Sequence, residues 1–234
     1  MKMGRFLFGA SGMTLGAASL VLHDQLISMW SFPGAPIFLY VTSIAQMLGG
    51  LAMVFPATAK RGSLILGIVY AVIALTFVPP IFRQPTVYAS WGNVFYPLAL
   101  VAGAAAVYGL DSLATTMWGL CNLSFAIEQI EFFARTASLV PPWMPGGGNF
   151  WVVVTTVALA VAGIAILTRR QAQLASRLLT ILFLAFGVTI WIPMLIAYPG
   201  NHGNWSEGLE TIAIAGTAWI VADSVVPKER EPRS

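Results

Sequence analysis

Eight stretches of apolar residues, each about 18 to 22 residues long, follow one another along this chain of 234 residues. At a rise of about 1.5 Å per residue, a helix of this length crosses a hydrocarbon core of about 30 Å. Strands would have to alternate in polarity and close into a barrel, and runs such as residues 152–167 do not alternate. The pattern therefore predicts an all-α, polytopic membrane protein. The expected spans are 4–22, 36–56, 62–82, 93–110, 113–133, 149–168, 175–197 and 206–224.

The composition favours a membrane protein over a soluble domain. Hydrophobic residues make up 58% of the chain and charged residues only 9%, with a mean hydropathy of +0.80, whereas soluble domains carry about 25% charged residues. Lys2 and Arg5 before apolar residues 6–22 also resemble a secretory signal, but the remaining chain is equally apolar, which favours a first span. The net charge is only +3 and the basic residues are scattered, so we expect no nucleic acid as a partner. The expected partner is the lipid bilayer.

The basic residues predict the orientation in the membrane. Given these spans, only Arg83 and Arg135 of the twelve Lys and Arg residues lie on one side. The other basic residues lie at the termini or in the even-numbered loops, so the positive-inside rule places both termini in the cytoplasm. These residues are Lys2, Arg5, Lys60, Arg61, Arg169, Arg170, Arg177, Lys228, Arg230 and Arg233.

The tryptophans gather near the opposite ends of the predicted spans. Trp30, Trp91, Trp143, Trp151 and Trp205 all lie in or beside loops rich in proline and glycine. Amphipathic rings are enriched at the level of the lipid headgroups, so this distribution is typical of an aromatic belt at the outer surface.

The chain also contains an internal repeat with an offset of about 110 to 114 residues. Lys60-Arg61 corresponds to Arg169-Arg170, the Pro80 helix end to Pro193, and Trp91 to Trp205. Since each unit contains an even number of spans, both units enter the membrane in the same direction, as two parallel four-helix repeats. The predicted units are 1–111 and 112–226, followed by a charged cytoplasmic tail at 227–234.

The second unit resembles the DoxX-like family of membrane proteins. An acidic helix (residues 124–135) leads into a loop at 136–145 that reads TASLVPPWMP, close to the family's TASLVPxWxP pattern. Arg169-Arg170, Ile192-Pro193 and Trp205 before an alanine-rich last helix continue the resemblance. Members are four-helix membrane proteins, some similar to the membrane subunit of a thiosulfate:quinone oxidoreductase. The resemblance implies a bacterial cytoplasmic (inner) membrane protein with a redox or quinone connection, here as a tandem double unit.

Charged side chains inside a span are costly, and few are present here. In the fifth predicted span Cys121, Ser124, Glu128, Glu131 and Arg135 follow spacings of 3, 4, 3 and 4, which places them on one face of a helix. The last span begins with a second acidic pair on one face. That pair is Glu207 and Glu210.

We therefore expect these four carboxylates to converge on an outward-facing pocket in the second half, with Arg135 and either Arg83 or His202 as counter-charges. Carboxylates so grouped cannot all stay ionised, so at least one should hold a proton that can be given to a quinone carbonyl. The catalytic candidates are Glu128, Glu131 and Glu210, and the substrate-binding candidates are Arg135, Trp143, His202, Trp205 and Glu207.

A structural role remains open. In this interpretation Glu131 pairs with Arg135, Glu207 lies among the headgroups, and Glu128 and Glu210 are hydrogen-bond partners between helices. We expect no metal, because His23 and His202 share no ligand spacing with these carboxylates.

Three functions are therefore open. The first is a quinone- or redox-associated membrane subunit with quinone as its non-covalent cofactor. The second is a non-catalytic scaffold or assembly subunit, with other membrane subunits or a second copy of the chain as partner. The third is a small-solute carrier, which is disfavoured because no mid-span broken helix occurs in both halves. No sequence motif indicates a particular reaction.

Overall fold

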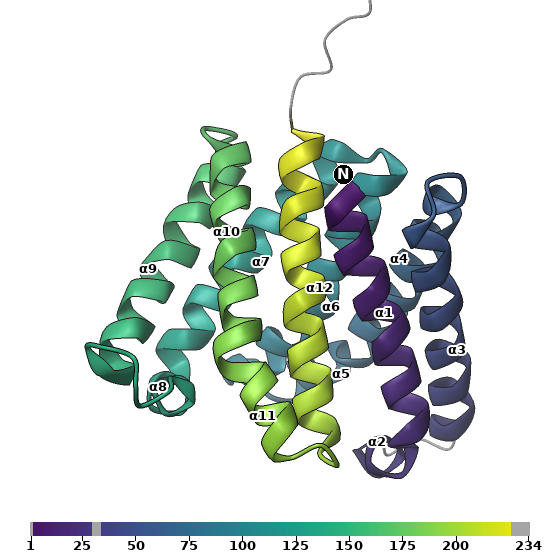
Figure 1. Cartoon of the computed structure of the whole chain (residues 1–234), viewed down its shortest axis with the longest axis horizontal. Helices are drawn as coiled ribbons and strands as arrows, with labels where there is room; N and C mark the ends of the chain where they lie inside the picture. Colours follow the sequence, from purple (N-terminus) through teal and green to yellow (C-terminus); the bar gives the residue numbers. More distant parts are fainter. Residues whose placement is uncertain (1, 30–33, 226–234) are drawn as a thin grey trace, which may run out of the picture.

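The computed structural model describes residues 2–29 and 34–225. Its secondary structure is 86% helix, and no strand occurs among these residues. Trp30, Lys228, Arg230, Arg233 and the predicted tail 227–234 lie outside them. The helices, shown in Figure 1, are α1 (Lys2–Val21), α2 (His23–Met29), α3 (Ala35–Val54), α4 (Ala59–Thr76), α5 (Val78–Arg83), α6 (Tyr88–Tyr108), α7 (Asp111–Glu131), α8 (Phe133–Leu139), α9 (Gly147–Leu167), α10 (Ala172–Phe186), the π-helix η1 (Gly187–Trp191), α11 (Ile192–Ala197) and α12 (His202–Ser224).

Five helical segments in the described part are long and apolar enough to cross a membrane. They comprise α3, α4 with α5, α6, α9, and α10 with η1 and α11. The other three predicted spans, 4–22, 113–133 and 206–224, coincide with α1, α7 and α12, which have 20, 21 and 23 residues. These three are richer in glycine, serine and charged residues. The structure therefore supports a helical protein with five apolar spans, and the count of eight stays a prediction.

The third and seventh predicted spans end at 82 and 197, within one residue of Arg83 and Ala197, where α5 and α11 end. Pro80 and Pro193 do not themselves end a helix, because the chain continues beyond them as these short helices. Pro80 lies in the first turn of α5, where its missing N–H leaves no hydrogen bond unmade. Pro193 directly follows the π-helix η1 within a continuous helical segment. The fifth predicted span, 113–133, has the same length as α7 but lies two residues later, since α7 ends at Glu131 and Phe132 has a non-helical backbone conformation. Arg135 consequently lies on α8.

The long helices pack in pairs that repeat along the chain. Helix α3 packs against α1 and α4, and α4 against α6, while α9 packs against α7 and α10, and α10 against α12. Three further contacts join these groups: α6 packs against α7, α12 against α1, and α12 against α6. In Figure 1, α12 runs through the middle of the bundle between α1 and α10.

Small residues allow these helices to approach closely. A Cβ atom added to Gly9 of α1 would lie 2.6 Å from the carbonyl oxygen of Gly50 on α3, and one added to Gly16 would lie 2.5 Å from that of Ser43. Gly4, near the start of α1, lies beside Gly216 in the second half of α12, so α1 and α12 run antiparallel. Small faces are the usual means of close packing between membrane helices. Gly9 and Gly16 therefore allow close contacts between helices of the same chain.

Three tryptophans make the same hydrogen bond at the beginnings of three helices. The indole Nε1–H groups of Trp91, Trp151 and Trp205 donate hydrogen bonds of 2.8 Å to the carbonyls of Pro85, Pro145 and Pro199 respectively, each six residues earlier. Each bond closes the loop that leads into α6, α9 or α12. The aromatic belt predicted from the sequence thus includes a repeated Pro-x5-Trp turn.

Candidate functional site

The candidate site is built around a hydrogen bond between α6 and α7. The phenol of Tyr96 donates to Oε1 of Glu128 over 2.7 Å. Glu128 is half-buried, and the face of α7 below it is fully buried as far as Cys121. Because α6 packs against α7, Tyr96 reaches across the helix interface to the one carboxylate in the middle of the polar face.

Two carboxylates of α12 lie beside this pair. Glu207 is close enough to Glu128 for their charges to interact, and Glu210 interacts with both Glu207 and Tyr96. The hydroxyl of Ser206 donates to Glu210 over 3.2 Å. We call Glu128, Glu207, Glu210 and Tyr96 the Glu–Tyr cluster.

Arg135 supplies the positive charge at the exposed edge of the Glu–Tyr cluster. Its guanidinium lies 3.9 Å from Oε1 of Glu207, and both side chains are well exposed, at 74% and 49%. At this distance and exposure the ion pair contributes little to stability, about 0 to 1 kcal/mol. The break at Phe132 makes this contact possible, since it turns α8 away from the axis of α7. Glu131, the partner expected in the structural interpretation, makes no ion pair with Arg135 among the described residues.

A second tyrosine of α6, Tyr88, also ties the two helices together, at Ser124, about one turn before Glu128 on α7. The Tyr88 hydroxyl lies 2.5 Å from the carbonyl oxygen of Ser124 and 2.7 Å from its Oγ. Tyr88 also lies near enough to Glu131 for an electrostatic interaction, although Glu131 itself is exposed at the end of α7. Tyr88 and Tyr96 therefore line one side of the polar face of α7.

Aromatic rings form the apolar floor beneath the Glu–Tyr cluster. The ring centroids of Tyr96 and Phe125 lie 5.2 Å apart, and Phe125 meets Phe183 of α10 at 6.2 Å in an edge-on arrangement. The fully buried Trp118 contacts Phe183 at 6.0 Å. Such contacts add roughly 0.5–1.5 kcal/mol each beyond simple burial, so these rings help to stabilise the core.

The other predicted site residues lie elsewhere. Trp143 is 71% exposed in the loop after α8. His202 is buried, and its backbone N–H donates to Oε1 of Gln25 on α2 over 3.0 Å, which ties the start of α12 to α2. Trp205 is engaged with Pro199, and Arg83 is exposed at the end of α5. Among the described residues neither Arg83 nor His202 pairs with a carboxylate.

Sequence reasoning assigned this site to the second half and missed the tyrosines of the first half. Tyr70 of α4 also interacts with Glu210, so α4 and α6 both contribute. A signal was present: at the repeat offset of 114, Tyr96 occupies the position of Glu210. A polar side chain at the same depth in both units could have indicated that the two positions face a shared interior.

Two pockets in the structure lie away from the Glu–Tyr cluster. One is lined by Gln25, Tyr198, Gly200 and Asn201, and the other by residues around Arg5 and Lys60. Within the described ranges, no three His, Cys, Asp or Glu side chains are grouped as ligands of a metal ion. Comparison with protein-family models, with curated proteins and with solved structures found no match.

Proposed function

We propose that this chain is an integral protein of the bacterial inner membrane with eight spans in two parallel four-helix units, and that its Glu–Tyr cluster binds a quinone. In this architecture α1, α3, α4–α5 and α6 form the first unit, and α7, α9, α10–α11 and α12 form the second. The equivalent helices have equivalent neighbours: α1–α3 matches α7–α9, α4–α6 matches α10–α12, and α6–α7 matches α12–α1. Trp91 and Trp205 make the same turn at the start of the fourth helix of each unit.

The proposed orientation can be tested with two exposed polar residues in the first turns of neighbouring helices. Asn149 begins α9 on the predicted outer side, and Gln173 begins α10 on the predicted cytoplasmic side. In a Cys121→Ser background, an impermeant thiol reagent added to intact cells should label Asn149→Cys and leave Gln173→Cys unlabelled. Both should react after the cells are lysed. Labelling of Gln173→Cys alone in intact cells would reverse the orientation.

The observation that carries the ligand proposal is the Tyr96–Glu128 hydrogen bond beside Glu207 and Glu210. Three carboxylates near one arginine cannot all be ionised at a membrane interface, so one of them holds a proton. A protonated carboxyl can donate to a quinone carbonyl, and the phenol of Tyr96 would become a second donor by turning from Glu128 to the ligand. The exposed Arg135–Glu207 edge is the side from which a ligand would enter. The DoxX-like resemblance of the second unit favours a quinone over other carbonyl compounds.

The direct test is to purify the chain from native membranes in mild detergent and to identify the extracted small molecules and the co-purifying proteins by mass spectrometry. We expect about one quinone per chain in the wild type and none in Glu128→Leu. Partner proteins without a quinone would refute the proposal in favour of an assembly subunit. The Tyr96–Glu128 bond would then serve only to hold α6 against α7.

A further inference from the structure

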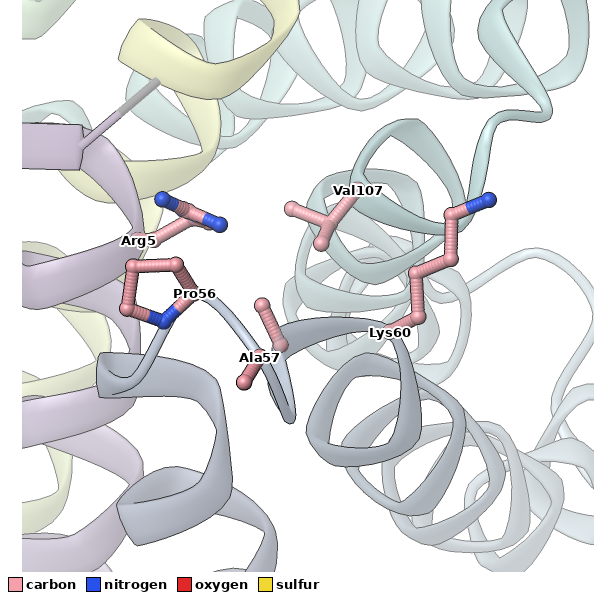
Figure 2. Close-up of a pocket in the computed structure, with 6 residues that line it drawn as sticks. Arg5, Pro56, Ala57, Lys60 and Val107 are labelled. Atoms are coloured by element: carbon pink, nitrogen blue, oxygen red, sulfur yellow. The ribbon is translucent and has the colours of Figure 1, made fainter.

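The second pocket lies at the opposite end of the bundle from the Glu–Tyr cluster, where α1 begins and α6 ends. It has a volume of about 310 Å³ and is lined by Arg5 of α1, Pro56 and Ala57 of the turn between α3 and α4, Ala59 and Lys60 of α4, and Val107 of α6. Small-molecule sites have volumes of roughly 300–1,000 Å³, so this pocket is large enough for a headgroup-sized ligand. In Figure 2, Arg5 and Lys60 extend from different helices on either side of Val107.

Neither cation of this pocket is neutralised by the described part of the chain. No carboxylate there lies within ion-pair distance of Arg5 or Lys60. The Nε atom of Arg5 is buried and has no hydrogen-bond acceptor among the described residues. A buried donor without an acceptor costs roughly 1–3 kcal/mol, and more when the group is charged, so this arrangement indicates an external acceptor.

The start of α4 adds further unpaired donors. Thr58 precedes α4, but its hydroxyl donates to the carbonyl oxygen of Ala52 over 2.7 Å and does not cap the helix. The first backbone N–H groups of an uncapped helix carry partial positive charge and bind anions. Ala59 and Lys60, in this first turn, both line the pocket.

We propose that this pocket binds a phosphate group, and that the phosphate belongs to the headgroup of an anionic phospholipid. Phosphate offers several acceptor oxygens to Arg5, to Lys60 and to the N–H groups of α4. The lining contains no carboxylate for the ammonium of a zwitterionic headgroup, so a headgroup with net negative charge fits best. Basic pockets between membrane helices on the cytoplasmic side are sites for such lipids. Pro56, Ala57 and Val107 provide an apolar wall for the glycerol end.

Arg61 provides a matched control for this proposal. It is adjacent to Lys60 and exposed, and it does not line the pocket. Lys60→Gln and Arg61→Gln change the net charge equally, so a general attraction between a basic surface and an anionic lipid would weaken equally in both. Arg5→Gln removes the buried donor, and the double variant Arg5→Gln/Lys60→Gln removes both cations.

The experiment is a titration of the purified, delipidated full chain in detergent with phosphatidylglycerol, with phosphatidylcholine and with inorganic phosphate, measured by native mass spectrometry. Wild-type protein and Arg61→Gln should bind phosphatidylglycerol in preference to phosphatidylcholine. The double variant should bind it at least about tenfold more weakly, since each cation near an anionic headgroup contributes on the order of 1 kcal/mol. An unchanged thermal unfolding midpoint without lipid establishes that the variants are folded.

Three outcomes would overturn the proposal. An equal loss of phosphatidylglycerol affinity in Lys60→Gln and Arg61→Gln would mean that only surface charge matters. Equal binding of phosphatidylglycerol and phosphatidylcholine would mean that the headgroup is not recognised. Tight binding of inorganic phosphate without phosphatidylglycerol would exclude the lipid as the source. Because the quinone proposal concerns the other end of the bundle, each can fail without the other.

Discussion

Gly9→Ala should destabilise the protein strongly although it adds a single methyl group. The new Cβ would lie 2.6 Å from the carbonyl oxygen of Gly50 and 3.1 Å from the Cβ of Met53. The first of these atoms belongs to the backbone of α3, so neither helix can relieve the contact by a change of rotamer. Overpacking of this kind costs about 1–3 kcal/mol. The loss should appear as a lower thermal unfolding midpoint in detergent.

Gly67→Ala is the matched control for this variant. Its added Cβ would meet only the Cβ of Ala104, at 3.3 Å, across the α4–α6 contact. Both substitutions replace a helical glycine by alanine and so give the same intrinsic gain in helix propensity, about 1 kcal/mol. Gly67→Ala should therefore be neutral or slightly stabilising. Equal midpoints for the two variants would show that α1 and α3 do not approach as closely as described.

Tyr96→Phe should weaken quinone binding by about tenfold or more while leaving the fold intact. The substitution removes one hydroxyl, which donates to Glu128 in the structure and which the proposal turns to the quinone carbonyl when the ligand binds. A buried polar group left without its hydrogen-bond partner costs roughly 1–3 kcal/mol. The measurement is a quinone titration of the purified variant.

Tyr108→Phe on the same helix serves as its control. Tyr108 lies at the other end of α6, is 45% exposed and makes no hydrogen bond through its hydroxyl with the described residues. The Tyr108→Phe variant should bind quinone with the affinity of the wild type. If Tyr96→Phe also binds normally, the Tyr96 hydroxyl holds helices together and does not contact a ligand.

The long apolar stretches of the sequence were enough to predict the helical class and the positions of the long helices. Five of them are apolar enough to cross a membrane on their own sequence, whereas α1, α7 and α12 lie among other helices and carry the glycines, serines and carboxylates of the interior. The electrostatic interaction between Glu128 and Glu207 could be anticipated because each lies on the polar face of its helix.

The contribution of Tyr96 could not be predicted in the same way. Its role depends on α6 packing against α7, and spacing within one helix does not specify which helices become neighbours. From the sequence we expected all carboxylates of the site to come from the first and fourth helices of the second unit, with Arg135 and either Arg83 or His202 as counter-charges. Instead α7 packs mainly on α6 and α9, so the first unit supplies one wall.

Local backbone details were also beyond the sequence pattern. The polar face from Cys121 to Arg135 reads as one continuous helix, but Phe132 has φ −107° and ψ 34° and ends α7. The Pro-x5-Trp turns are visible in the sequence once known. Because tryptophan is common at membrane interfaces in any case, the spacing alone did not distinguish a hydrogen-bonded turn from a general aromatic belt.

The most direct test of the proposed function is the pH dependence of quinone binding in Glu128→Gln. In this proposal protonated Glu128 donates to the quinone carbonyl, so the affinity of the wild type for quinone should fall as rising pH removes that proton. The charged or titratable neighbours of Glu128 are Tyr96, Glu207, Glu210 and Arg135. Glutamine keeps a donor but cannot titrate, and Tyr96 can still donate to its amide oxygen.

We therefore expect Glu128→Gln to bind quinone with an affinity that does not change with pH, and to unfold at the wild-type temperature. Asp111→Asn, an acid-to-amide change at the far end of the same helix, should keep the wild-type pH profile. If Glu128→Gln retains the wild-type pH dependence, Glu128 is not the titrating group and its proposed role as proton donor to the quinone is wrong.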